Sequence, residues 1–237
     1  MPVYNTPQKL AAEFLGTFAL VFFGEGAICA EQFLHGAGGM GLLGIALAHG
    51  LAIGVMVCAI GHVSGGHFNP AVTMAFWVTK RLNTFEVFGY WIAQIVGAVA
   101  AAFFLKAVLP REEAWLPVLG GTPDLARDFT RLPAIGLEGI ATFFLVFVVF
   151  AAAVDKSSSA RPYAGLCIGI TITLGILCSG RSREGPSIPR APSVPPWRAR
   201  IGPTTECIGS ARWPAASSPG SFTTFCTASS SSNFEST

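Results

Sequence analysis

Two histidines and an asparagine stand between apolar runs in residues 61–73, GHVSGGHFNPAVT. Imidazole can transfer a proton or bind a metal, and a carboxamide can donate a hydrogen bond to a neutral oxygen. His62 and His67 do not have the i, i+4 spacing of a zinc-binding helix. No nucleophile–base pair, phosphate-binding loop or metal-ligand set is visible around them, so we expect no catalysis, no metal site and no cofactor. The chemistry that remains is hydrogen bonding to a small neutral solute by Asn69.

The residues around Asn69 predict a tight turn followed by a short helix. Gly65 and Gly66 let the backbone turn sharply and approach a neighbour closely. Asn69 is a good helix N-cap, and Pro70 suits the first helical position. The helix that follows has only about ten apolar residues, too few to cross a bilayer. Its N-terminus would direct a partial positive charge at whatever lies in front of Asn69.

The composition is that of an integral membrane protein. The chain has 237 residues, of which 51% are hydrophobic and 12% charged, whereas soluble domains carry about 25% charged residues. The net charge of +2 gives no reason to expect nucleic-acid binding. The six cysteines show no CxxC pattern, so neither a disulfide framework nor a metal site is indicated. We expect no cleavable signal peptide, because the first apolar run is long and no basic stretch precedes it.

A helix needs about 20 apolar residues to cross a bilayer. Four apolar runs have this length and a fifth is slightly shorter. They cover residues 10–30, 40–60, 85–108, 133–154 and 163–179. Residues 107–132 predict an ordered surface loop. The short connections are basic, which places them and the N-terminus on the cytoplasmic side; the residues concerned are Lys9, Lys80, Arg81, Lys156 and Arg161.

An internal repeat links the first and fourth spans. The segment AEFLGTF at residues 12–18 recurs as LEGIATF at residues 137–143, so that Glu13 matches Glu138 and Thr17 matches Thr142. Counting the first, three spans lie between corresponding points of the two copies, so the copies run in opposite directions, which is an inverted repeat of the transporter and channel type. A carboxylate within a span is costly and has a specific role. We expect Glu13 and Glu138 to accept hydrogen bonds from re-entrant backbone, a structural role rather than proton transfer.

The pattern HxSGGHxNPAVT in residues 62–73 resembles the signature of the aquaporin (major intrinsic protein) family, and the resemblance extends from residue 10 to about residue 180. It implies an all-α membrane protein, an inverted repeat forming a right-handed helix bundle. The printed chain would supply five spans and one half-helix of a plan with six spans and two half-helices. The resemblance also implies a homotetramer with one pore in each subunit.

The resemblance places Asn69, Pro70 and Ala71 at the pore and makes the protein a passive channel for water, with some permeability to ammonia or another small neutral solute. We expect the backbone carbonyls of Gly65, Gly66, His67 and Phe68 to form a ladder of acceptors, since irregular backbone at this depth is tolerated where it lines a cavity.

An outer constriction of four residues is a further feature of the family. His49 and Ile176 align with its positions on the second and fifth spans. In orthodox water channels the residues at these two positions resemble a Phe and His pair. The His and Ile of this chain instead resemble the tonoplast-type subgroup. A hydrogen-bonded packing role is the alternative for His49.

After Gly180 the composition changes abruptly. Residues 181–237 hold half of the chain's 16 prolines, many serines and arginines, and no apolar run long enough to span a bilayer. Yet the repeat requires a second Asn-Pro-Ala near residue 190. Read with the last base of each codon and the first two bases of the next, residues 188–195 can encode Asn-Pro-Ala-Arg-Ser-Phe-Gly-Pro. We interpret this as a one-base frame change near Gly180, in the gene or in its sequencing.

The frame change divides the chain into an incomplete channel domain, residues 1–180, and a tail, residues 181–237, that we expect to be disordered. Two alternatives to a water channel remain, and the first is a glycerol-type facilitator. Glycerol facilitators typically have an Asp after the Arg of the second motif, and the restored reading has none. The other is a non-conducting truncated subunit. A membrane-embedded enzyme is the rival of a different class. We expect a multi-pass protein of the plasma or inner membrane, whose partners are the lipid bilayer, water and small neutral solutes.

Overall fold

The computed structural model describes residues 4–34, 39–121 and 131–179. The chain divides into two units, Met1–Ile188 and Pro189–Thr237, and only the first contains described residues. The expectations about the tail, its disorder and its frame, therefore lie outside the described residues.

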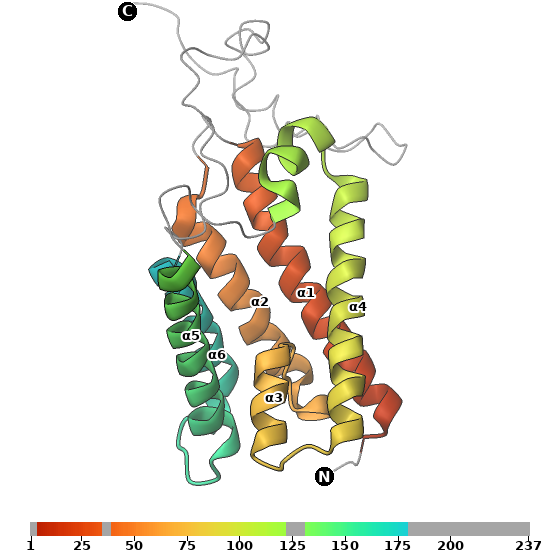
Figure 1. Ribbon diagram of the computed structural model, residues 1–237, viewed down its shortest axis with the longest axis vertical. Helices are drawn as coiled ribbons and strands as arrows, with labels where there is room; N and C mark the ends of the chain where they lie inside the picture. Colours follow the sequence, from red (N-terminus) through yellow and green to blue (C-terminus); the bar gives the residue numbers. More distant parts are fainter. Residues whose placement is uncertain (1–3, 35–38, 122–130, 180–237) are drawn as a thin grey trace, which may run out of the picture. The chain divides into compact units, whose positions relative to one another are not determined.

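The described residues are helical throughout, apart from their connections, and five helices are long and apolar enough to cross a membrane (Figure 1). These are α1 (Thr6–Phe33), α2 (Gly41–Ser64), α4 (Thr84–Val108), α5 (Arg131–Val148), which continues into a π-helical segment (Val149–Val154), and α6 (Ala164–Ser179), which follows a 3₁₀ turn (Arg161–Tyr163). The half-helix α3 (Pro70–Val78) is too short to span. The five predicted spans and the half-helix are thus confirmed.

The connection after α4, which we expected to be an ordered surface loop, contains two short helical turns. Arg111–Trp115 forms a π-helical turn and Leu116–Gly121 a 3₁₀ turn. Leu119, Gly120 and Gly121 have positive φ angles there. Two packed glycines explain the course of the chain: Gly120 lies against the Trp115 ring and Gly121 against Glu25 of α1, so neither position has room for a side chain.

Small residues let α2 and α6 pack closely. Each helix has two glycines one turn apart, and a Cβ on Gly50 or Gly169 would overlap a backbone carbonyl of the other helix. The Thr173 hydroxyl donates a hydrogen bond across this interface to the Ala46 carbonyl, at 3.2 Å. In lipid, where burial of apolar surface does not drive helices together, such close contact and hydrogen bonds hold them.

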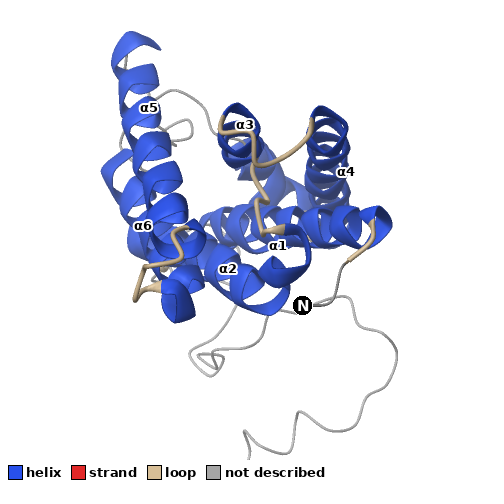
Figure 2. Cartoon of the chain, turned by 90° about the horizontal axis from the view of Figure 1, so that it is seen from below, coloured by secondary structure: helices blue, strands red, loops and turns tan. Residues whose placement is uncertain are grey.

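Figure 2 shows α1 between α2 and α4, with α5 beside α6. The buried core lies where α2, α6 and the π-helical end of α5 meet α3 and the segment before it, and it is formed by Ile53, Phe68, Val72, Val149 and Ile168. Many large apolar side chains face outward, among them Phe85, Ile92 and Phe103, as expected of a surface that meets lipid.

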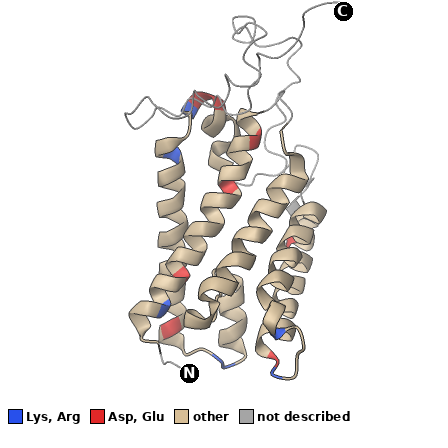
Figure 3. Cartoon of the chain, turned by 180° about the vertical axis from the view of Figure 1, so that it is seen from behind, with Lys and Arg blue, Asp and Glu red and all other residues tan. Residues whose placement is uncertain are grey.

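Basic side chains lie towards both ends of the described helices (Figure 3). Lys9 at the start of α1 forms an ion pair with Glu86 at the start of α4, at 2.9 Å. The Arg81 guanidinium, in the connection between α3 and α4, lies 5.7 Å from the centre of the Phe150 ring. The N-terminus and the two basic connections are therefore at the same end of the molecule.

Candidate pore site

Asn69 begins the half-helix as its N-cap. Its side-chain Oδ1 accepts a hydrogen bond from the Ala71 backbone N–H at 2.8 Å, and Pro70 occupies the first helical turn. Because the cap uses Oδ1, the amide Nδ2 is the group left to donate elsewhere. The Trp91 indole N–H donates to the Pro70 carbonyl at 3.3 Å, which ties the start of α3 to α4.

A small cavity lies in front of Asn69. It offers about 20 Å³ to the centre of a water molecule, and about 10–15 Å³ is enough for one water. Its polar lining comes from the re-entrant segment and its apolar lining from the surrounding helices; the residues are Leu20, Ile53, Gly66, His67, Asn69, Val72, Leu145, Val149, Ile168 and Ile172. An apolar wall with a few polar groups is suited to a neutral solute.

A buried carboxylate holds the re-entrant segment in place. Glu13 of α1 is fully buried. Its Oε1 accepts hydrogen bonds from the Ser64 hydroxyl at 2.6 Å and from the His67 N–H at 3.0 Å. Its Oε2 accepts from the Phe68 N–H at 2.7 Å and from the Gln94 amide at 2.8 Å. Glu13 therefore satisfies two backbone N–H groups of the re-entrant segment, at buried residues where an unpaired donor would be costly.

Four polar residues of this network were not among the residues expected from the sequence. Gln94 of α4 donates both to Glu13 and to the Thr73 hydroxyl of α3, the latter at 3.0 Å. The Tyr90 hydroxyl donates to the Ser64 carbonyl at the end of α2, at 2.7 Å. Tyr90 and Gln94 lie one turn apart within an apolar span, and this pair of polar side chains is the sequence feature that could have identified them.

The His67 side chain hydrogen-bonds a side-chain hydroxyl, and the residue also lines the cavity. Its ring is buried against Phe76, with 4.2 Å between the ring centres, and Nδ1 lies 3.1 Å from the Thr73 hydroxyl. That hydroxyl gives its proton to the Asn69 carbonyl at 3.1 Å. The Thr73 oxygen is thus the acceptor and His67 Nδ1 the donor.

Of the four residues expected to form a carbonyl ladder, two line the cavity and two do not. Gly66 and His67 line the cavity, and Gly65 and Phe68 are not among its lining residues. Gly65 ends α2 with a φ of 98°. Phe68 is buried with a φ of 47°, and its carbonyl accepts the Thr17 hydroxyl at 3.3 Å. The Phe68 ring lies on Gly16 of α1, where a Cβ would overlap it.

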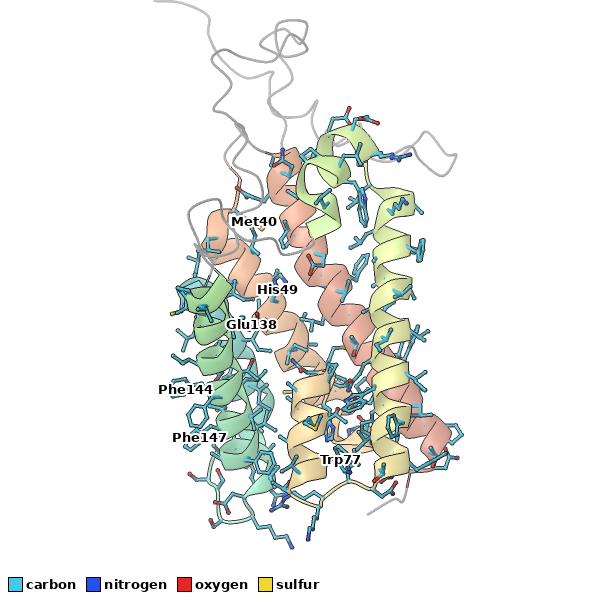
Figure 4. All side chains as sticks on the ribbon, viewed as in Figure 1. Met40, His49, Trp77, Glu138, Phe144 and Phe147 are labelled. Carbon is cyan, nitrogen blue, oxygen red and sulfur yellow. The ribbon has the colours of Figure 1, made fainter. Side chains whose placement is uncertain are left out.

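The structure places His49 and Ile176 one helical turn beyond cavity-lining residues. His49 precedes Ile53 by four residues on α2, and Ile176 follows Ile172 by four on α6. The His49 Nδ1 donates to the Ile45 carbonyl at 2.9 Å, and its ring lies against Gly24 of α1. Figure 4 shows the positions of His49 and Glu138.

Glu138 differs from Glu13 in its surroundings. It lies on an exposed side of α5, and the second re-entrant segment that we expected to bind it lies outside the described residues.

The comparisons agree with the motif and the architecture. The family model "Major intrinsic protein" matches residues 3–197, a range that includes the start of the segment whose frame we interpret as changed. The chain is 36% identical to aquaporin NIP1-1 of Oryza sativa subsp. japonica over 214 residues, covering 86% of this chain and 72% of that protein. It is 42% identical to aquaporin NIP3-1 of Arabidopsis thaliana over 177 residues, covering 73% of this chain and 53% of that protein.

The fold is also that of a solved structure. The aquaglyceroporin from Plasmodium falciparum superimposes with a TM-score of 0.66 at 21% identity, covering 75% of this chain and 74% of that one. The five spans, the half-helix begun by Asn69 and the match over most of the chain lead to one conclusion. The chain belongs to the major intrinsic protein family, whose members are membrane channels and not enzymes.

Proposed function

We propose that this sequence encodes one half of a pore that conducts water and small neutral solutes passively. The observation that carries the proposal is the cavity in front of Asn69, where an amide and a helix N-terminus meet an apolar wall. The name aquaporin of the plant relatives supports water as the first solute.

The mechanism follows from two features of the cavity, the Asn69 amide and the N-terminus of α3. Asn69 Nδ2 donates a hydrogen bond to the oxygen of a passing water, while Oδ1 remains bound to the Ala71 N–H. The N-terminus of α3 adds a partial positive charge, which orients the water oxygen towards Asn69 and opposes cations. The carbonyls of Gly66 and His67 accept hydrogen bonds from the water further along the wall. No covalent bond is broken, so the solute crosses down its own concentration gradient.

Selectivity would depend on the four-residue outer constriction, to which His49 and Ile176 contribute and the restored frame adds a Gly and an Arg. Ile176 has no ring and no hydrogen-bond donor, so this constriction is wider and less polar than one with Phe and His. It should admit ammonia or another small neutral solute beside water. Protonation of His49 at low pH would oppose cations further.

The second half of the pore requires the restored reading frame. The printed sequence contains only one Asn-Pro pair, at residues 69 and 70. We propose that the frame-restored polypeptide is the conducting one, with a cytoplasmic N-terminus, and that it forms homotetramers in a plasma or inner membrane. The printed chain itself would be a non-conducting truncated subunit. A glycerol-type facilitator stays the alternative for the restored protein.

The substitution Asn69→Asp separates the donor role of Asn69 from its capping role. Aspartate is as good an N-cap as asparagine, so α3 should still form, but a carboxylate cannot donate a hydrogen bond. In frame-restored protein reconstituted into liposomes, stopped-flow light scattering should show reduced water permeability for Asn69→Asp. The control Asn83→Asp changes the N-cap of α4, which is not among the residues lining the cavity, and should leave permeability unchanged. Wild-type permeability in folded Asn69→Asp would refute the role of the amide.

A further inference from the structure

The end of α3 places a lysine in a backbone conformation that favours glycine. Lys80 has a φ angle of 56°. Its N–H donates to the Trp77 carbonyl, and the N–H of Arg81 donates to the Phe76 carbonyl, both at 2.8 Å. These two bonds form a Schellman motif, in which the left-handed position is usually glycine. Residues held in such conformations cluster at functional sites, so the Lys80 side chain calls for a role that glycine could not fill.

The neighbouring cation, Arg81, is held in place by an aromatic ring. Its guanidinium lies 5.7 Å from the centre of the Phe150 ring, on the π-helical end of α5. The Phe150 ring in turn packs on the Phe76 ring of α3, with 5.0 Å between centres. At the other side of the connection, the Trp77 indole N–H donates to the Thr84 hydroxyl at the start of α4, at 3.2 Å. Two adjacent cations therefore stand on a backbone that is fixed at both ends.

No carboxylate among the described residues neutralises these two cations. Lys80 and Arg81 are both exposed, and neither forms an ion pair within the described part of the chain. The acidic residue at the start of α4, Glu86, instead binds the Lys9 ammonium at 2.9 Å and the Asn83 amide at 2.7 Å. The connection thus presents two positive charges that are available to an anion from outside.

The residues beside this connection are those of a membrane surface. Phe85, the second residue of α4, is 79% exposed, and Phe88 one turn later is also exposed. Trp77 lies at the end of α3 (Figure 4) and is partly exposed. Because α4 is a membrane-spanning helix that begins at Thr84, Lys80 and Arg81 lie at the level of the lipid headgroups, and aromatic rings are typical of this level. A ligand that fits both features has an anionic head and an apolar tail.

We propose that Lys80 and Arg81 bind the phosphate of an anionic glycerophospholipid, in the leaflet that meets the start of α1, and that an acyl chain of this lipid lies along Phe85. A guanidinium can give two parallel hydrogen bonds to a phosphate, and an ammonium adds a point charge. The contact with Phe150 orients the guanidinium before the lipid arrives, so less side-chain freedom is lost on binding. This site lies apart from the residues that line the cavity in front of Asn69, so it does not depend on water conduction.

Native mass spectrometry of the full 237-residue chain in detergent tests the proposal. The probes are phosphatidylglycerol and, for comparison, phosphatidylcholine with the same acyl chains. One phosphatidylglycerol should bind at least about fivefold more tightly than phosphatidylcholine, since each basic residue at an anionic lipid surface contributes about this factor. Lys80→Gly removes the ammonium and relieves the strained backbone, so it should weaken phosphatidylglycerol binding about fivefold while Tm stays the same or rises. Arg81→Gln should weaken it by a similar factor.

The matched control is Lys156→Gln in the connection between α5 and α6, which removes the same charge. Asp155 precedes Lys156 and accepts hydrogen bonds from the Ser157 hydroxyl and N–H, at 2.7 Å and 2.8 Å, so a carboxylate already offsets this lysine. Lys156→Gln should change the affinity for phosphatidylglycerol less than about twofold.

Three results would overturn the proposal. Equal losses of affinity in Lys80→Gly and Lys156→Gln would mean that only the total charge matters. Phosphatidylcholine binding as tight as that of phosphatidylglycerol would mean that the headgroup is not recognised. Displacement of phosphatidylglycerol by inorganic phosphate would identify a free anion, and not a lipid, as the ligand of the two cations.

Discussion

Replacing Glu13 by glutamine should destabilise the re-entrant segment without changing the size of the side chain. Glu13 accepts four hydrogen bonds, two on each oxygen. Glutamine has one acceptor oxygen and one donor NH₂ group, so two of the four donors would face another donor. If the oxygen of the new amide stays with Ser64 and His67, the groups left without an acceptor are the Phe68 N–H and the Gln94 amide.

The magnitude follows from these two lost bonds. A buried donor without a partner costs about 1–3 kcal/mol, and hydrogen bonds within membrane proteins contribute about 0.6 kcal/mol on average. The free energy of unfolding should therefore fall by about 1–6 kcal/mol, where the lower end is the membrane value for two bonds. For a chain of this size, each kcal/mol corresponds to about 2–4 °C in Tm.

Thermal unfolding in detergent, followed by the reactivity of the buried Cys29 thiol, would measure the effect. The matched control is Glu138→Gln, which changes the same residue type at the equivalent position of the repeat, where the side chain is exposed. Glu13→Gln should lower Tm by at least about 2 °C more than Glu138→Gln does. Equal shifts in the two variants would refute the view that Glu13 holds the re-entrant segment.

Three further predictions follow from close contacts and from the outer constriction. Gly16→Ala should lower Tm, because its Cβ would overlap the Phe68 ring, whereas Gly136→Ala should not, because nothing lies within 4 Å of a Cβ there; equal Tm values would contradict the packing. Gly169→Leu should disrupt the α2–α6 interface and abolish monodisperse elution in size-exclusion chromatography, whereas Gly139→Leu, on an open face, should elute normally. The double substitution His49→Phe with Ile176→His, in the frame-restored protein, should reduce the ratio of ammonia to water permeability in stopped-flow assays. An unchanged ratio would mean that these two residues do not form the constriction.

The sequence allowed the prediction of those parts of the fold that depend on local pattern. Long apolar runs indicated the five spans, and Asn69 followed by Pro70 indicated the start of the half-helix. The repeat located Glu13, because a carboxylate within a span needs a specific role. These features are visible in a single segment, so no knowledge of the packing was needed.

The rest depends on contacts between segments far apart in the chain. Gln94 was missed because its role appears only when α4 lies beside α1. The His67 ring binds the Thr73 hydroxyl rather than a carbonyl, since the turn of α3 brings Thr73 under it. The carbonyl of Phe68 points at Thr17, a choice set by a positive φ that periodicity does not indicate.

The most direct test of the pore compares water permeability for the printed chain and for the frame-restored polypeptide. Both are reconstituted into liposomes of the same lipid at the same protein density, and shrinkage is followed by stopped-flow light scattering. The restored protein should shrink the vesicles faster than protein-free liposomes, and the printed chain should not. Folded, restored protein that conducts no better than empty liposomes would contradict the account, as would equal water conduction by the printed chain.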